Sequence, residues 1–269
     1  MVKISEDFAL SRHLKFSTNA DPKKSKTKCL IFSQHIRERE GILPILLNQD
    51  PLPWVETVKH LGNKLECDNS MRQDLAMKKG KFIGKVNSLS QEFHFASSEV
   101  LLKVINTYCT SFHGSGLWDL CSNESERLFK AWNVCMRMTF KVPWTTHRYL
   151  IEAISGHLHL KVMLASRSVK FLDSMKKSSK LGIRFLAGIS ELDLRTVMGR
   201  NMASIADEVG VEACRLTPTI VKAKMMYSRV PENQTWRVSL LGELMDERKL
   251  IPGFTDSEIS TMKNYLCTS

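Results

Sequence analysis

The residues closest to a recognisable chemistry are four lysines in a short N-terminal segment: Lys23, Lys24, Lys26 and Lys28. They lie between two apolar segments, where Asp21 and Pro22 favour a turn. Ammonium groups on a turn can contact the phosphates of a nucleic acid. Lysine-rich turns are more often simply solvated, and composition alone favours that interpretation.

The cysteines and histidines are the next candidates, but their spacing matches no metal or catalytic site. The seven cysteines include no Cys-X-X-Cys pair. Cys109 and His113 lie one helical turn apart, but no second pair completes a zinc site, so we expect both to be packing residues. His157 and His159 are expected in a loop or at the start of a helix. The number of cysteines is odd, and the N-terminal residues do not resemble a signal peptide. Both features indicate an intracellular location, in the nucleus or the cytoplasm.

Enzyme motifs are missing from the sequence. It contains no phosphate-binding loop, dinucleotide-binding fingerprint, zinc-protease motif or nucleophile elbow. It also lacks an Asp-Asp dipeptide, and two-metal phosphoryl transfer needs clustered carboxylates to hold both ions. We therefore expect no catalytic residue, no metal ligand and no cofactor in this chain.

The charge balance favours a polyanionic partner. Lys and Arg number 39 against 28 Asp and Glu, which gives a formal net charge of +11. Such an excess is typical of proteins that bind nucleic acid or an anionic membrane, although a merely basic protein has it too. No apolar run reaches transmembrane length, so we expect no membrane partner.

The elements that would position these residues differ along the chain. The N-terminal part mixes a helix ending near residue 15 with short strands. A strand, a basic turn and a second strand are predicted over 16–32, and a loop over 36–50. Residues 52–66 predict a hairpin that bends at Gly62.

Helical periodicity begins after residue 68. The helix predicted over 71–95 has a basic stripe of Arg72, Lys78, Lys79, Lys81 and Lys85. Ser97 or Ser98 is expected to cap the next helix. Its predicted apolar face is Leu101, Val104, Ile105, Tyr108 and Phe112.

Further helices are predicted towards the C-terminus. Asn123 and Glu126 form a capping box before a helix that Pro143 ends. The apolar stripe of that helix is Leu128, Trp132, Cys135 and Met136. Thr146 is expected to cap a short helix. Longer helices are predicted over 160–178, 183–215 and 234–250, with a loose segment over 216–235.

Several segments together carry a family resemblance. They are FSTNADPKKSKTKCLIF, LPWVETVKHLG and the stretch from SGLWDLCSNESERLFKAWN to PWTTHRYLIEAISG, followed by MGRN at 198–201 and WRVSLLGEL. In order and spacing they resemble the C-terminal part of a non-LTR (LINE-type) retrotransposon reverse transcriptase. The activity of that family is RNA-directed DNA synthesis, so the resemblance implies this activity, and the binding of Mg²⁺, for an intact parent enzyme only.

The resemblance implies a mainly α fold. A helical thumb and connector over 67–180 would follow a small β-containing remnant of the polymerase palm over 1–66, and a C-terminal helical region would occupy 181–269. Lys26 and Lys28 match a palm element near the incoming nucleotide. The residues that match the primer grip are Val58, Lys59, His60, Leu61 and Gly62, although His60 stands where the family often has an aromatic residue. The cations expected to contact the nucleic-acid backbone are Arg72, Lys78, Lys79, Lys81, Lys85, Arg127, Lys130, Arg137 and Arg148.

The main departure from the family concerns catalysis. Its catalytic carboxylates precede the first matching segment, and this chain begins after them. We therefore expect a truncated, inactive reverse transcriptase that still binds RNA, DNA or an RNA–DNA duplex. The alternatives are a helical protein-interaction module and a domesticated subunit that joins a separate catalytic chain.

Overall fold

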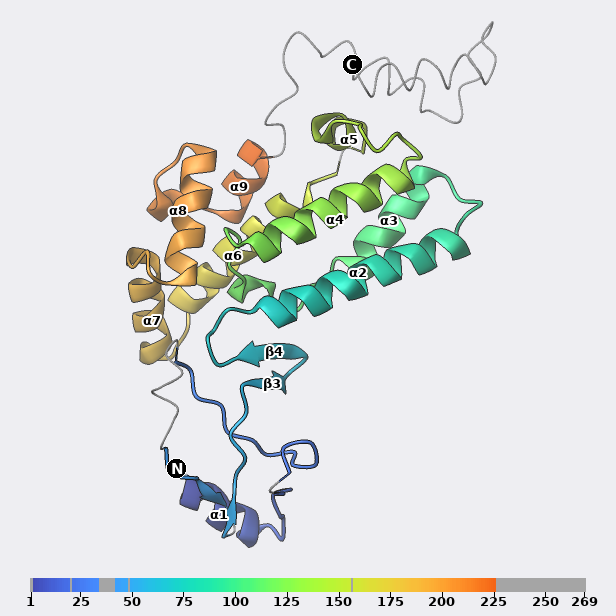
Figure 1. The fold of residues 1–269 in the computed structure, drawn as a ribbon. Coiled ribbons are helices and arrows are strands. Elements are labelled where there is room, and N and C mark those ends of the chain that lie inside the picture. Colours follow the sequence, from blue (N-terminus) through green and yellow to red (C-terminus); the bar gives the residue numbers. More distant parts are fainter. Residues whose placement is uncertain (1, 20, 34–41, 48, 156, 226–269) are drawn as a thin grey trace, which may run out of the picture. The chain divides into compact units, whose positions relative to one another are not determined.

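The computed structural model describes residues 2–19, 21–33, 42–47, 49–155 and 157–225. Within them the fold is mainly helical, with nine α-helices and four short strands (Figure 1), which confirms the predicted fold class. The chain divides into two compact units, Met1–Ala76 and Met77–Ser269. The division into palm remnant, thumb and C-terminal region remains a prediction.

The first unit contains one helix and two small hairpins. Helix α1 spans Val2–Ser11, β1 (Leu46–Leu47) pairs with β2 (Asp50–Pro51), and β3 (Thr57–His60) pairs with β4 (Asn63–Glu66). Leu61 and Gly62 connect β3 to β4 with φ angles of 47° and 83°. Two residues with positive φ make the tight turn that suits the twist of an antiparallel pair, so the predicted hairpin at Gly62 is confirmed.

Two predictions for this unit are wrong. Among the described residues, the segment 16–32 forms no pair of strands; it has one isolated parallel bridge, from Cys29 to Trp54. The turn is present, since the amides of Lys24 and Ser25 both donate to the carbonyl of Asp21. However, the polar residues before the turn supply few β-formers for the first strand, and Cys29 in the second is bridged to Trp54 instead. The expected loop over 36–50 is also wrong in its described part, because β1 and the start of β2 lie there.

The second unit consists of packed helices. Helix α2 begins in the last residues of the first unit, and most of its length belongs to the second. The bounds of these helices are α2 Arg72–Glu92, α3 Ser98–Cys109, α4 Asn123–Thr139, α5 Arg148–Ser155, α6 Leu160–Lys176, α7 Leu181–Leu192, α8 Val197–Val209 and α9 Pro218–Met225. Short 3₁₀ turns lie at Ser115–Leu117 and Ala213–Arg215. Within this unit α4 packs against α3, α5 and α6, and α6 packs against α7, α8 and α9 (Figure 1).

An aromatic cluster forms the centre of the helical core. The Phe82 ring of α2 lies 5.7 Å from the Trp132 ring of α4 and 5.9 Å from that of Phe112, whose ring is 5.6 Å from Trp118. All four side chains are buried. Burying one such ring contributes roughly 1.5–3 kcal/mol relative to leaving it exposed, so this cluster fixes α2 against α4.

Several helix-level predictions need correction. Tyr108 was predicted on the apolar face of α3 but is 63% exposed, whereas Leu102 and Cys109 are buried. The buried side of α3 is therefore rotated about the helix axis from the predicted face. Ser122 rather than Asn123 caps α4 by accepting from the amide of Ser125. Thr146 caps nothing: its hydroxyl is buried and has no hydrogen-bond partner among the described residues.

Other predictions hold. Ser97 caps α3, with its hydroxyl accepting from the amide of Val100 at 3.4 Å. The apolar stripe of α4 is buried as predicted, and that helix ends before Pro143. The segment 216–235, predicted as loose, contains α9 over its described part, while the helix predicted over 234–250 lies outside the described residues.

Candidate nucleic-acid interface

The solvent-facing side of α4 and the turn that follows it carry four cations. Arg127, Lys130 and Lys141 are exposed, and Arg137 is half-buried. The two glutamates of α4 lie in its first turn, so every charged residue after Glu126 in this helix is a cation. Ion pairs among the described residues use other cations. These four charges therefore remain available to an anionic partner.

The spacing of these cations suits a phosphate backbone. Steps of three and seven residues keep Arg127, Lys130 and Arg137 near one side of a helix with 3.6 residues per turn, and Lys141 lies in the turn beyond it. From Arg127 to Arg137 the helix advances about 15 Å. One strand of a duplex carries about four phosphates over that distance. The side chains can thus reach successive phosphates.

The C-terminal end of α4 determines where Lys141 lies. The amide of Val142 donates to the carbonyl of Arg137 at 3.1 Å, and the amide of Lys141 donates to that of Met138 at 3.1 Å. This pair of bonds is a Schellman ending, which needs a left-handed residue after the cap. Lys141 takes that conformation with a φ of 53°, where glycine is usual. The turn therefore holds a cation in a position that most sequences give to glycine.

Arg137 holds the chain beyond this turn against α4. Its Nε and Nη2 atoms both donate to the carbonyl of Thr146, at 3.0 and 2.6 Å. Burial lowers the pKa of Arg137, although an arginine remains a cation at neutral pH. Arg137 therefore has a structural task in addition to its charge.

A hollow of about 490 Å³ opens on this same side of α4. Its apolar walls are Val134, Met138, Val142 and Trp144, and its polar lining is Lys130, Asn133, Arg137 and Lys141. Trp144 is 85% exposed, and Val134 and Met138 are exposed too. The hollow thus combines a basic rim with an accessible aromatic ring.

The predicted basic stripe of α2 does not form one surface. Lys78, Lys81 and Lys85 follow one another at helical spacing, whereas Lys79 lies on the other side of the buried residue Phe82. The Nζ of Lys85 donates to the carbonyl of Tyr108 in the last turn of α3 at 3.2 Å. The Nζ of Lys78 donates to the carbonyl of His113 at 3.1 Å. Lys85 thus binds the last turn of α3, where a cation is favourable, and Lys78 binds the segment that follows that helix. Lys81 is exposed and is the remaining candidate of the three for contact with a partner.

The other residues predicted to contact nucleic acid lie outside the segment that forms the surface of α4 and the turn after it. Arg148 pairs with Glu152 at 3.1 Å within α5, which offsets its charge. In the first unit, Arg72 and Lys26 are exposed and Lys28 is half-buried. The predicted primer-grip residues occupy β3 and its turn: Val58 is half-buried, and Lys59, His60, Leu61 and Gly62 are exposed.

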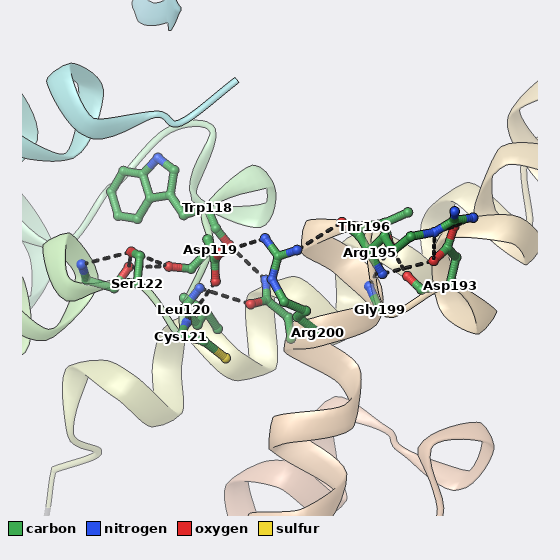
Figure 2. Close-up of polar contacts among 12 residues, drawn as sticks. Trp118, Asp119, Leu120, Cys121, Ser122, Asp193, Arg195, Thr196, Gly199 and Arg200 are labelled. Atoms are coloured by element: carbon green, nitrogen blue, oxygen red, sulfur yellow. Dashed lines mark hydrogen bonds and ion pairs between the residues drawn. The ribbon is translucent and has the colours of Figure 1, made fainter. Parts of the chain in front are cut away.

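A second polar cluster joins α8 to the segment before α4 (Figure 2). Asn201, fully buried, donates to the carbonyl of Trp118 at 2.7 Å and accepts from the amide of Leu120 at 2.9 Å. Arg200 pairs with Asp119 at 2.7 Å. A Cβ on Gly199 would meet the carbonyl oxygen of Asp193 at 2.3 Å, so only glycine fits there. The MGRN segment therefore has a packing role that accounts for its glycine, arginine and asparagine.

The paired histidines also have structural positions. His159 caps α6, as expected for a helix start: its Nδ1 accepts from the amide of Lys161 at 3.1 Å, and its Nε2 lies 2.9 Å from Oδ1 of Asn133. Burial lowers its pKa to about 3, with help from Arg148 and Lys161. His159 is therefore neutral.

Cys109 and His113 were both expected to be packing residues. Cys109 is buried, but the His113 side chain is exposed, which corrects the prediction for His113.

Two residues of this surface, Lys141 and Trp144, were missed from the sequence. Trp144 lies beyond the predicted end of the helix at Pro143, and Lys141 lies beyond the observed end of α4 at Thr139. Outside a helix, periodicity gives no information about orientation. The one usable signal was a tryptophan directly after Pro143, in a segment too polar to bury it.

Comparison with known proteins adds no relative. No family model, no curated protein and no solved structure matches this chain. No three His, Cys, Asp or Glu side chains in the described part of the chain gather closely enough to hold a metal ion. None of the described helices is both long and apolar enough to span a membrane.

Proposed function

We propose that this chain binds nucleic-acid duplexes through their phosphates, using the exposed side of α4, and catalyses no reaction itself. The observation that carries the proposal is the set of four cations, Arg127, Lys130, Arg137 and Lys141, along α4 and the turn after it, where the two glutamates of α4 are confined to its first turn. Lys81 of α2 adds a further exposed cation in the same unit. Neutralised phosphates release counterions, which is the main source of affinity for such a surface.

The resemblance to non-LTR reverse transcriptases supports the same proposal. All four cations lie in the segment that resembles the thumb and connector, which follow the template–primer duplex. The hairpin of β3 and β4 has the form expected of a primer grip. We infer that the chain is a thumb-containing part of such an enzyme, with RNA–DNA and DNA duplexes as its ligands. The catalytic aspartates of that family have no counterpart here, so the proposal includes no polymerase step.

Fluorescence anisotropy with a labelled RNA–DNA duplex and a labelled DNA duplex tests this proposal. The test variant replaces Arg127, Lys130 and Lys141 with Ala. The control replaces Lys180, Lys222 and Lys224, which are also exposed, so both variants lose the same charge. We expect the α4 variant to lose about tenfold or more in affinity and the control less than about threefold. Equal losses would mean that net charge, rather than this surface, drives binding.

A second candidate, a helical protein-interaction module, is supported by α7. Leu181, Phe185, Ile189 and Leu192 share one side of that helix and are all exposed in the described structure. A module of this kind would have no affinity for duplexes even at about 50 mM salt, where phosphate contacts are strong. The same anisotropy assay therefore separates the two candidates.

A further inference from the structure

We propose that the hollow beside α4 binds an unpaired nucleotide, with its base stacked on Trp144 and its phosphates at Lys130 and Lys141. This inference rests on the proposed nucleic-acid binding and adds a second kind of ligand to it: single-stranded RNA or DNA at the end of a duplex. Phosphate contacts alone would not need the apolar half of this hollow.

The lining of the hollow is complementary to a nucleotide. A nucleotide offers an apolar planar base and an anionic phosphate. The hollow offers an exposed indole with two exposed apolar neighbours, Val134 and Met138, and cations with no carboxylate among them. Its volume of about 490 Å³ lies within the roughly 300–1,000 Å³ of small-ligand pockets.

The exposure of Trp144 needs an explanation that packing does not supply. Single exposed apolar residues are ordinary, but here three stand together on one surface. A tryptophan can stack on any base, because every base has a π face. Cations beside an aromatic platform form the usual arrangement of a surface for single strands.

The local backbone holds this arrangement in place. Arg137 fixes the carbonyl of Thr146, and the amide of Thr146 donates to the carbonyl of Pro143 at 3.1 Å. Trp144 thus lies inside a closed turn that begins at Pro143, three residues after Lys141. The ring and the cation are therefore kept close together before any ligand binds, which lowers the entropy cost of binding.

Affinities for three labelled probes test the inference: an oligo(dT) and an oligo(rU) of about ten nucleotides, and a blunt DNA duplex. We expect Trp144→Ala to weaken binding of a single strand by about 5-fold to 150-fold, the range of one base–aromatic stack. Trp144→Phe should retain most of the affinity. The blunt duplex should change by less than about twofold, since its bases are paired and only its phosphates are contacted. The two oligonucleotides show whether the sugar matters.

Controls separate stacking from other effects. Phe95→Ala removes another exposed aromatic residue and should leave all affinities unchanged. Single strands should quench tryptophan fluorescence more in the wild type than in Trp144→Phe. An oligo-glutamate, which has anions but no bases, should bind independently of residue 144.

The possible failures are distinguishable. Single-strand affinity that is unchanged in Trp144→Ala, while the duplex still binds, would overturn this inference alone. Equal losses for single strands and oligo-glutamate would overturn it too, because the tryptophan would then not be reading a base. If neither the duplex nor the single strands bind at low salt, the proposed function fails together with the inference.

Discussion

Replacing Asn201 with Ala should destabilise the helical unit strongly. The Asn201 side chain is 0% exposed and satisfies two buried backbone groups, the carbonyl of Trp118 and the amide of Leu120. A buried polar group left without a partner costs about 1–3 kcal/mol, so the two together cost about 2–6 kcal/mol. A domain of this kind has about 5–15 kcal/mol of stability in total. The loss would therefore be a large share of it.

Urea unfolding followed by helical circular dichroism measures this loss. Asn87→Ala is the matched control, because Asn87 is an exposed residue within α2 and its replacement makes the same chemical change. We expect the control to stay within about 0.5 kcal/mol of the wild type. Hydrogen exchange should show that the Leu120 amide loses protection in Asn201→Ala only. A change below about 1 kcal/mol, with the Leu120 amide still protected, would refute the assigned role of this side chain.

Three further predictions concern pH, local stability and the end of α4. Burial lowers the pKa of His159 to about 3, below an unfolded value of about 6.5. The contribution of the neutral His159 side chain to the free energy of unfolding is therefore fully present above pH 6.5 and is lost as the pH falls towards 3. The loss is about 2 kcal/mol at pH 5, and unfolding free energies should show it in the wild type and in His113→Asn but not in His159→Asn. Hydrogen exchange should be faster in residues 28–33 and 55–61 than in 101–112, since the short strands of the first unit leave backbone groups unpaired; equal protection would contradict this. Lys141→Gly should raise thermal stability by about 1 kcal/mol while weakening duplex binding, whereas Lys141→Ala should weaken binding without stabilising; an unchanged melting temperature for Lys141→Gly would show that the left-handed residue is not strained.

Local signals predicted part of the fold well. The turn at Leu61 and Gly62 and the cap at Ser97 were both predictable, because each depends on residues that are adjacent in the sequence. Pro218 lies in the segment 216–235, which the sequence predicted to be loose. It is the first residue of α9, a position where its missing amide hydrogen costs nothing.

The candidate site was less predictable, because it depends on which side of each helix is covered. Lys79 and Lys81 are two residues apart but lie on different sides of α2, and only the position of Phe82 in the core shows which lysine faces outwards. Lys141 was hidden for another reason. A left-handed lysine follows no propensity, and the Schellman bonds that place it are visible only in three dimensions.

The dependence of duplex affinity on salt tests the central claim most directly. Four phosphate contacts from α4 predict that the logarithm of the association constant falls with the logarithm of salt concentration with a slope of about −3.6. Removing the charges of Arg127, Lys130 and Lys141 should reduce the steepness by about 2.7, while the Lys180, Lys222 and Lys224 control keeps the wild-type slope. A flat salt dependence in the wild type, or the same slope in both variants, would contradict binding of phosphates by this side of α4.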